Sequence, residues 1–257
     1  MDKIKLLQTI ETVSEQISII DPYAILAGGA IRDLVLGREV NDLDFYFFGG
    51  MCGTVDMGAA RLNTAFKVTD FESSWGADTF VYEGMSSLRR MWRSLSLDAR
   101  LGIPCQFMET INTDYGSLPC FVTSQMSCDL CDIHAPVRNG VGFIIPSSGF
   151  TLACLTKVSK IRGEYQPENS HMKKMQEYFP EYTFFTEADN NALGYTQVRE
   201  TARAKLAECR QQGSQLSREE SIQRDVMKLK LRTIWPGVGN IEFSNSGTIK
   251  SMELKYN

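Results

Sequence analysis

Apolar residues recur every three or four positions near the start of the chain. They are Ile4, Leu7, Ile10, Val13 and Ile17. On a helix this spacing places them on one face, so the pattern predicts an amphipathic helix over residues 3–18. Asp21-Pro22 is expected to end it, because proline cannot continue a helix.

A strand, a helix and a second strand are predicted next. The apolar run 23–27 is typical of a buried strand, and Gly28-Gly29 opens a helix over 29–36. Gly37 is suited to end that helix, because glycine readily takes the left-handed conformation found there. After a polar turn, residues 42–48 predict the second strand.

Weaker patterns predict the remaining elements of the first part of the chain. Helices are expected over 56–66, 86–100 and 151–162, of which the second is basic. Strands are expected over 80–82, 103–111 and 141–145, whereas the apolar segment 120–131 is ambiguous.

The chain changes in character near residue 165. Beyond this point it is polar, with helical periodicity over 170–178, 187–211 and 217–232. Asn245-Ser246-Gly247 predicts a hairpin over 240–256. We therefore expect an α+β head over residues 1–165 and a small, mostly helical C-terminal region over 166–257, whose role the sequence leaves open.

Composition and charge limit the classes of protein that fit. The 257 residues are 43% hydrophobic and 23% charged, which is typical of a globular protein and excludes a disordered chain. The net charge of −4 excludes a globally basic nucleic-acid binder, so contact with RNA or DNA would need a local basic patch. The two histidines are too few to favour a histidine-based catalytic triad.

The cysteines and the apolar runs indicate the cellular compartment of the protein. Seven cysteines form an odd, scattered set, which predicts reduced thiols rather than a disulfide framework. The first residues carry charges within their apolar stretch and do not resemble a signal peptide. The chain lacks the uninterrupted apolar run of roughly 18 residues that a transmembrane helix needs. We expect a cytoplasmic protein without membrane contact.

Gly28-Gly29 and Arg32 form a candidate phosphate site. Glycine lets an anion approach the backbone because it has no Cβ. The start of a helix adds unpaired N–H groups and the positive end of its dipole. Arg32 lies one turn into the predicted helix, where it would either contact a phosphate or form a local ion pair with Asp33.

Asp42 and Asp44 form a candidate metal site. Alternate residues of a strand face the same side, so the two carboxylates would lie side by side. Their repulsion is costly unless a cation sits between them, and Mg²⁺ accepts a few carboxylates together with phosphate oxygens and water. A phosphate site opposite such a pair suits metal-assisted nucleotidyl transfer.

Together these residues resemble the signature of the DNA-polymerase-β-like nucleotidyltransferase superfamily. The resemblance is to the head domain of bacterial poly(A) polymerases and class II CCA-adding tRNA nucleotidyltransferases. The matching elements are Gly28-Gly29, Arg32-Asp33, Leu36-Gly37 and Asp42-x-Asp44, at the family spacing. The resemblance covers about residues 20–165, is strong in 25–48, and implies an α+β head with a mixed sheet and flanking helices.

The resemblance implies an activity and a set of roles. Asp42 and Asp44 would hold the catalytic metal ions, Mg²⁺ or Mn²⁺. Gly28 and Gly29 would cradle the triphosphate of an incoming nucleoside triphosphate (NTP), and Arg32 would contact its phosphates or support Asp33. The reaction would move a nucleoside monophosphate from the NTP to a hydroxyl, with release of pyrophosphate. The implied acceptor is an RNA 3′ end, of tRNA or poly(A) type.

Two alternatives remain open for this activity. The acceptor could instead be a protein side chain or a small molecule, which a narrow acidic pocket would favour. The chain could also be a non-catalytic nucleotide- or RNA-binding relative that keeps the fold. Failure to bind the NTP with Mg²⁺ would favour that reading.

Weaker family matches lie downstream. A third metal carboxylate is common in the superfamily, with Glu109 as the best-placed candidate and Asp114 and Asp129 behind it. Thr123 and Gln125 stand where a family segment has a threonine and an asparagine, but the arginines and the aspartate of that segment are missing.

Residues 151–160 resemble the first neck helix that follows such heads. Its Lys157 and Lys160, together with Arg162, would either touch phosphates or face solvent.

Two other clusters carry possible chemistry. Cys128, Cys131 and His134, with Cys120 upstream, have some zinc character, but their apolar surroundings favour buried thiols. On the predicted helix 86–100, Arg89, Arg90 and Arg93 form a basic cluster beside Trp92. It would contact a nucleic acid or lie on a solvated surface.

Overall fold

The computed structural model describes most of the predicted head and parts of the C-terminal region. The described residues are 3–47, 66, 69–70, 88–94, 102–110, 118–139, 143–163, 165–186, 200, 203–204, 228–244 and 249–255. The predicted strand 80–82 and all of the predicted helix 56–66 except its last residue lie outside these ranges, as does most of the predicted helices 187–211 and 217–232.

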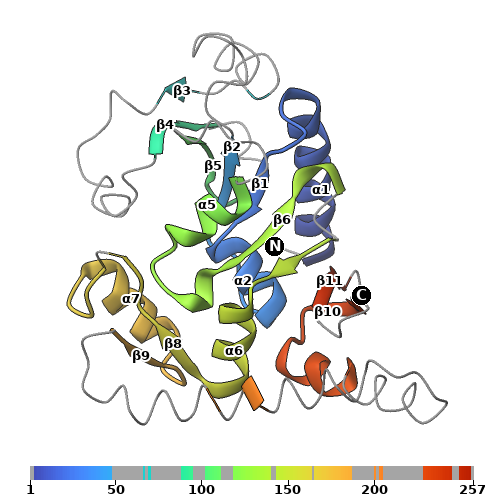
Figure 1. Cartoon of the computed structure of the whole chain (residues 1–257). Helices are drawn as coiled ribbons and strands as arrows, with labels where there is room; N and C mark the ends of the chain where they lie inside the picture. The colour runs from blue at the N-terminus through green and yellow to red at the C-terminus, as the bar shows by residue number, and fades with distance from the viewer. Residues whose placement is uncertain are drawn as a thin grey trace, which may run out of the picture.

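A seven-stranded mixed sheet forms the centre of the fold, with the strand order β3-β4-β5-β2-β1-β6-β7 (Figure 1). Its strands are β1 (Ile25–Ala27), β2 (Leu43–Phe47), β3 (Thr69–Asp70), β4 (Leu88–Arg93), β5 (Cys105–Thr110), β6 (Ile133–Pro136) and β7 (Ile145–Pro146). Strands β2 and β5 are parallel, and the other neighbouring pairs are antiparallel.

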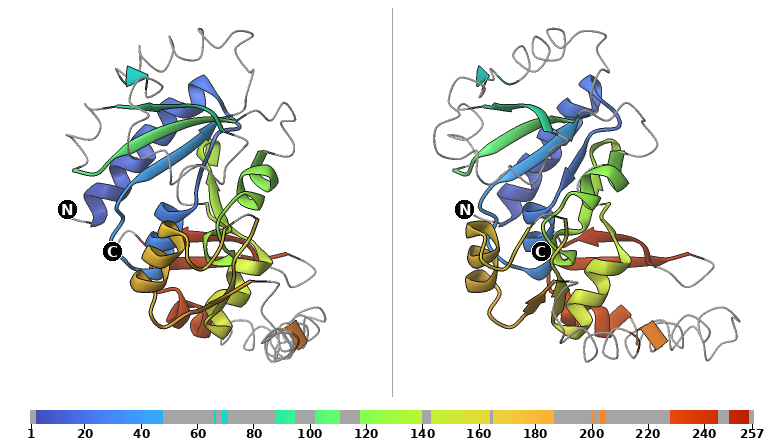
Figure 2. Two further views of the ribbon diagram at one scale, coloured as in Figure 1. Left: turned by 90° about the vertical axis from the view of Figure 1, so that its left-hand side faces the viewer. Right: turned by 60° about the vertical axis from the view of Figure 1, so that its left-hand side comes forward.

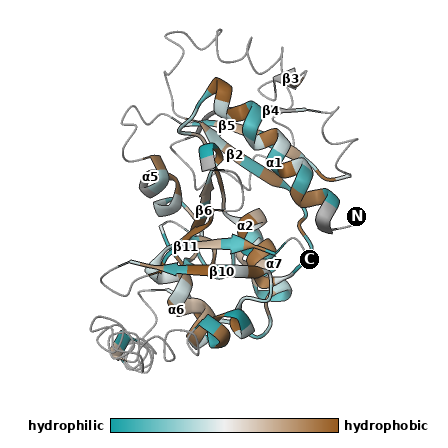
Figure 3. Cartoon of the chain, turned by 90° about the vertical axis from the view of Figure 1, so that its right-hand side faces the viewer, coloured by the Kyte–Doolittle hydropathy of each residue, from teal (hydrophilic) through white to brown (hydrophobic). Residues whose placement is uncertain are grey.

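Helices surround this sheet. They are α1 (Lys3–Ile20), α2 (Gly29–Leu36), α5 (Leu118–Ser124), α6 (Ser148–Thr156) and α7 (Ser170–Tyr178), with short 3₁₀ turns η4 (Asp129–Cys131) and η5 (Val137–Asn139). The long helix α1 runs beside the sheet, and hydrophobic and polar residues alternate along it (Figures 2 and 3). Its buried residues include Leu7, Ile10, Val13 and Ile17, as the periodicity predicts.

The two faces of β2 carry different residues. Phe45 and Phe47 point to the face where their rings pack against Phe107 of β5, with ring centroids 5.9 and 6.0 Å from it. Asp44 and Tyr46 alternate with them and therefore point to the other face. A central strand thus has an aromatic core on one side and the candidate metal residues on the other.

Within the predicted helix 86–100, the described residues 88–93 form the strand β4 instead. Trp92 and Met91 pair with Phe107 and Met108 of β5, and the Trp92 side chain is buried. The run Leu-Arg-Arg-Met-Trp-Arg suits either a helix or a strand. Its pairing with a distant strand and the burial of Trp92 decide the outcome.

The predicted helix 151–162 is also shorter than expected. Helix α6 ends at Thr156, because Lys157 takes a left-handed conformation with φ of 58°. The chain continues as β8 (Val158–Lys160), which pairs in parallel with β9 (Thr183–Phe185). Ser159 and Ile161 are buried at alternate positions, which is the period of a strand.

The C-terminal hairpin is confirmed and packs back onto the head. It consists of β10 (Val238–Phe243) and β11 (Ile249–Leu254), preceded by a helical segment over 228–234. Met252 pairs with Ile144 through two backbone hydrogen bonds of 2.8 and 2.9 Å. The backbone N–H of Gly237 donates to the carbonyl of Val35 at 2.9 Å. The last residues of the chain therefore hold the end of α2.

Among the described residues, no helix combines the length and the apolar character that crossing a bilayer requires.

We expect Gly237→Ala to destabilise the fold strongly. A Cβ at this position would lie 1.7 Å from the carbonyl oxygen of Leu34, so the backbone contact between the C-terminal segment and α2 would have to open. We expect a loss of about 2 kcal/mol or more in the free energy of unfolding, measured by urea denaturation. Gly239→Ala is the matched control, because its Cβ would meet only ordinary contacts from 3.5 Å. Equal stability of the two variants would contradict this account of the packing.

Candidate active site

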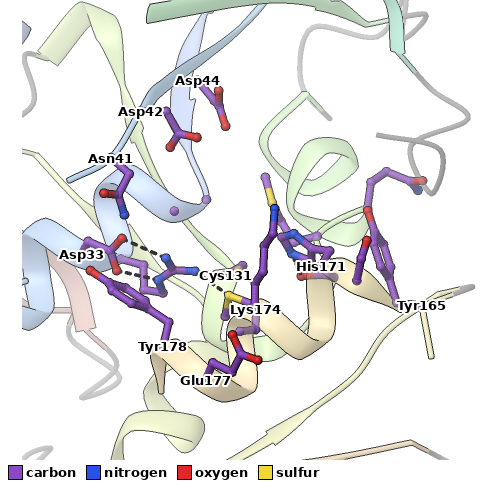
Figure 4. Close-up of a pocket in the computed structure, with 18 of the residues that line it drawn as sticks. Asp33, Asn41, Asp42, Asp44, Cys131, Tyr165, His171, Lys174, Glu177 and Tyr178 are labelled. Carbon is purple, nitrogen blue, oxygen red and sulfur yellow. Dashed lines mark hydrogen bonds and ion pairs between the residues drawn. The ribbon is translucent and has the colours of Figure 1, made fainter. Parts of the chain in front are cut away.

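One pocket, with a volume of about 600 Å³, contains the residues of both sequence motifs. Gly28, Gly29, Arg32, Asp42 and Asp44 all line it. The opposite wall comes from residues 125–127, from Cys131 and from α7 (Figure 4). The structure therefore brings the glycine pair, the arginine and the two aspartates of the motif together around one pocket.

At Gly28 and Gly29 the backbone itself lines the pocket, because glycine has no Cβ. Gly28 caps α2 with φ of 76° and ψ of −132°, a conformation that suits glycine. A Cβ there would lie 3.3 Å from Sδ of Met126. A Cβ on Gly29 would lie 3.5 Å from Nη2 of Arg32 and 3.9 Å from Oδ1 of Asp42. The start of α2 is thus open between the arginine and the carboxylate.

The two carboxylates are half-buried side chains that line the pocket together. Within the described part of the chain, Oδ1 of Asp44 is buried and has no hydrogen-bond donor. Burial raises the pKa of Asp44 well above its ordinary value, and the neighbouring Asp42 raises it further. Burial also raises the pKa of Asp42, although the positive charge of Arg32 opposes this shift. An orphaned carboxylate oxygen next to a second carboxylate fits a divalent cation.

Arg32 is a structural residue as well as a pocket residue. Its Nε and Nη2 donate to the two carboxylate oxygens of Asp33 at 2.8 and 2.9 Å. Its Nη1 donates to Sγ of Cys131 at 3.1 Å and to Sδ of Met175 at 3.2 Å. The guanidinium also lies over the ring of Phe179, 4.6 Å from its centroid. The local ion pair with Asp33 is therefore present, on a residue that still borders the pocket.

The wall that α7 contributes was not predicted from the sequence. It comprises Ser170, His171, Lys174, Met175, Glu177 and Tyr178, next to Tyr165. Asn169 starts this helix by accepting a hydrogen bond from the N–H of His171 at 2.8 Å. The helix itself is confirmed, but its periodicity does not reveal which structure its polar face borders. The predicted boundary near 165 remains a prediction, and residues on both sides of it line one pocket.

His171 and Lys174 differ in how they are held. Nε2 of His171 lies 3.0 Å from Oγ of Ser127, and its ring lies 5.8 Å from that of Tyr165. Burial lowers the pKa of His171, and the charges of Arg32 and Lys174 lower it further, so the ring is neutral at pH 7. Lys174 makes no hydrogen bond or ion pair with the residues that the structure describes. Its side chain extends from α7 into the pocket, toward the end where Asp42 and Asp44 lie (Figure 4).

The candidates for a third metal carboxylate do not join the pair. Glu109 pairs with Phe47, so it points to the face of the sheet opposite Asp44. Asp129 is bound to Arg162, which donates from Nε to its Oδ1 at 2.7 Å. Asp114 lies outside the described residues. Among the described residues, no group of three or more His, Cys, Asp or Glu side chains is arranged to hold a metal ion.

The structure places the residues of the weaker family matches in different surroundings. Gln125 lines the pocket, whereas Thr123 is buried and its carbonyl accepts from Nη1 of Arg162 at 3.2 Å. The predicted neck helix is helical only as far as Thr156, so Lys157 and Lys160 do not lie on a helix. Nζ of Lys157 donates to the hydroxyl of Tyr182 at 3.0 Å, and Arg162 also pairs with Asp132.

The other two clusters also change in the structure. Cys128 and Cys131 are buried thiols with their Sγ atoms 3.9 Å apart. His134 lies on β6, where burial lowers its pKa to about 4. The basic cluster of Arg89, Arg90 and Arg93 lies on the strand β4, so the predicted basic helix does not exist there.

Comparison with known proteins shows a likeness of fold. No protein-family model matches the sequence, and a search of curated proteins finds no match either. The solved complex of a CCA-adding enzyme with ATP has a TM-score of 0.50 and 13% identity, over 93% of this chain and 54% of that one. An apo CCA-adding enzyme gives a TM-score of 0.49 and 13% identity, over 92% of this chain and 54% of that one.

A third solved structure is the Thermotoga maritima CCA-adding enzyme complexed with tRNA. It gives a TM-score of 0.44 and 13% identity, over 93% of this chain and 57% of that one. The chain thus spans little more than half the length of these proteins. The likeness to the ATP complex concerns the fold alone, and it confirms the expected α+β resemblance to a nucleotidyltransferase head.

Asp44→Asn is expected to stabilise the protein at neutral pH without divalent ions. A raised carboxyl pKa means that the folded state binds more protons than the unfolded chain between the ordinary and the raised pKa. Stability therefore falls as pH rises through that window. Removing the charge should raise the free energy of unfolding by about 1 kcal/mol or more and make it depend less on pH. Thermal unfolding from pH 4 to 8 measures both effects.

The matched control is Glu15→Gln, which removes an exposed carboxylate of α1. Mg²⁺ should raise the melting temperature of the wild type and of the control, but not that of Asp44→Asn. Equal stability and equal Mg²⁺ response in all three proteins would contradict the buried-charge account.

Proposed function

We propose that the chain transfers a nucleoside monophosphate from an NTP to a hydroxyl acceptor and releases pyrophosphate. The observation that carries this proposal is the geometry of one pocket. A half-buried carboxylate pair with one orphaned, buried oxygen faces the open start of a helix beside a buried arginine. The fold that holds this pocket is similar to that of a CCA-adding enzyme solved with ATP, which supports an NTP as the donor.

Each part of the pocket suits one part of that substrate. Asp42 and Asp44 would hold Mg²⁺ or Mn²⁺, which when bound stabilises charge on the attacking hydroxyl and on the leaving pyrophosphate. Gly28 and Gly29 leave room for phosphate oxygens at the unpaired N–H groups that begin α2. Arg32, fixed by Asp33, adds a positive charge whose position does not depend on the substrate.

Lys174 is proposed as the second cation for the phosphates. It stands on the wall opposite the carboxylates and has no described protein partner, so it is available to an anion in the pocket. A flexible ammonium group acts on a phosphate as a point charge, in contrast to the fixed fork of Arg32. Arg32 and Lys174 would then both contact the triphosphate from the wall of the same pocket.

An RNA 3′ end is proposed as the acceptor, of tRNA or poly(A) type. The protein of similar fold that was solved with ATP is a CCA-adding enzyme, which motivates the choice. The pocket gives no reason to prefer a cationic small molecule, because Arg32 and Lys174 offset part of its acidic lining.

The activity is tested by offering each α-labelled NTP with Mg²⁺ or Mn²⁺ to a tRNA pool, to an oligoribonucleotide and to the protein alone. We expect label in RNA, with the preferred NTP separating CCA-type from poly(A)-type addition. Asp42→Asn and Asp44→Asn should each lower the rate by about 10²-fold or more, because each removes charge that holds the metal ion. Glu15→Gln should react at the wild-type rate.

Label on the protein alone would move the acceptor away from RNA. The absence of transfer together with failure to bind Mg²⁺-ATP, measured by calorimetry, would overturn the proposed function and favour a head without activity.

Lys174→Ala is expected to weaken Mg²⁺-ATP binding about tenfold, since one charge-assisted phosphate contact of about 1.4 kcal/mol would be lost. The matched control is Lys173→Ala, its exposed neighbour on α7, which does not line the pocket. Calorimetric titration without acceptor isolates the nucleotide step from any contact with RNA. Equal affinity in the two variants would remove Lys174 from the phosphate site.

A further inference from the structure

The wall of the pocket behind Arg32 contains two thiols at short range. Cys128 precedes the turn η4 and Cys131 ends it, and the backbone N–H of Cys131 donates to the carbonyl of Cys128 at 3.0 Å. Their Sγ atoms lie 3.9 Å apart. A disulfide has a bond length of about 2.05 Å, so the two sulfur atoms need to approach by roughly 2 Å.

The two thiols have different surroundings. Cys131 lines the pocket, and Nη1 of Arg32 donates to its Sγ at 3.1 Å (Figure 4). Cys128 does not line the pocket and is completely buried behind Cys131. A small molecule that enters the pocket therefore meets Cys131 first.

The charge state of the pair follows from these contacts. The hydrogen bond from the Cys128 thiol and the positive charge of Arg32 lower the pKa of Cys131 to about 6, against the effect of burial. The hydrogen bond to Cys131 and burial raise the pKa of Cys128 well above its ordinary value. At neutral pH the pair thus holds a thiolate at the pocket and a protonated thiol behind it.

We propose that Cys128 and Cys131 form a reversible redox pair that reacts with small peroxides through the pocket. The Cys131 thiolate attacks one oxygen of hydrogen peroxide, the O–O bond breaks, and sulfenic acid and hydroxide result. The Cys128 sulfur then attacks the sulfur of the sulfenic acid, and the S–O bond breaks. The released hydroxide takes up the Cys128 proton and leaves as water. The hydroxide of the first step takes a proton from solvent, so the thiolate and the thiol are oxidised to one disulfide while one peroxide is reduced to two waters.

The disulfide would change the neighbourhood of Arg32. The reduced pair offers this guanidinium an anionic sulfur, whereas a disulfide sulfur is neutral and a weak acceptor. Arg32 would keep Asp33 as its only charged partner among the contacts described above. Oxidation therefore removes an anionic partner of Arg32, the residue that links α2 to the pocket wall.

The test uses the full-length protein and does not depend on its proposed activity. Reduced protein is treated with hydrogen peroxide at pH 7, blocked with N-ethylmaleimide, digested and mapped by mass spectrometry. We expect a bond between Cys128 and Cys131 that forms at least about tenfold faster than any oxidation of Cys154, and that dithiothreitol reverses. Cys154 is the internal reference, because it is equally buried and burial raises its pKa to about 11.

Variants identify the order of the two steps. Cys128→Ser should stop at a Cys131 sulfenic acid that dimedone traps, and Cys131→Ser should leave Cys128 reduced. Cys154→Ser should form the disulfide at the wild-type rate. Circular dichroism shows whether each variant folds, and the wild-type result stands even if a variant does not.

Several results would overturn the proposal. The first is that Cys128 and Cys131 stay reduced in the wild type while Cys154 is oxidised. The second is a disulfide from either of the two to a third cysteine. The third is oxidation of Cys128 at an unchanged rate in Cys131→Ser. Each of these is distinct from failure of nucleotidyl transfer, which is measured with reduced protein.

Discussion

The guanidinium of Arg32 ties three separate parts of the chain to one another. It belongs to α2, binds the carboxylate of Asp33 on the same helix, donates to Cys131 of η4, and contacts Met175 and Phe179 at and beyond α7. The group is almost fully buried, and a buried cation is tolerable only where anionic or polar partners surround it. Burial lowers the pKa of Arg32, but Cys131 and Asp33 together raise it above its ordinary value, so the charge persists.

This arrangement explains why the pocket has two walls that lie far apart in sequence. Gly28-Gly29 at the start of α2 (the glycine corner) and the carboxylate pair come from the first fifty residues, and the facing wall comes from α7. Contacts of Arg38 reinforce the link, since its guanidinium lies 4.2 Å from the ring centroid of Phe179 and pairs with Glu181. The C-terminal segment then fixes the other end of α2 through Gly237. Helix α2 is therefore held at both ends by residues that follow position 165.

Local sequence patterns predicted the part of the site that local geometry determines. The order of strand, glycine pair, helix and second strand sets Gly28, Gly29, Asp42 and Asp44 around one corner, and short-range preferences suffice to build it. The facing wall could not be predicted in this way. The periodicity of α7 shows that it has a polar face, but only tertiary contacts of Met175 and Phe179 with Arg32 decide what that face borders.

The wrong predictions share a physical cause. Residues 88–93 fit the period of a helix, yet pairing with β5 makes them a strand. Residues 158–160 continue a helical pattern, yet pairing with β9 draws them into a second sheet. Glu109 lies on β5, the strand next to the one that carries Asp44, yet the register of β2 and β5 places the two side chains on opposite faces of the sheet. In each case a long-range strand pairing, which no local pattern contains, sets the outcome.

The charges of the pocket favour a ligand that carries both signs. Asp42 and Asp44 lie in surroundings that raise both of their pKa values, and a bound cation would offset that cost. A cation alone would leave Lys174 without a partner and add repulsion with Arg32. An anion alone would satisfy these two side chains but would be repelled by the carboxylates. A polyphosphate that brings a divalent cation with it meets both demands at once. The electrostatics of the pocket and the openness of its glycine corner thus lead independently to the same class of ligand.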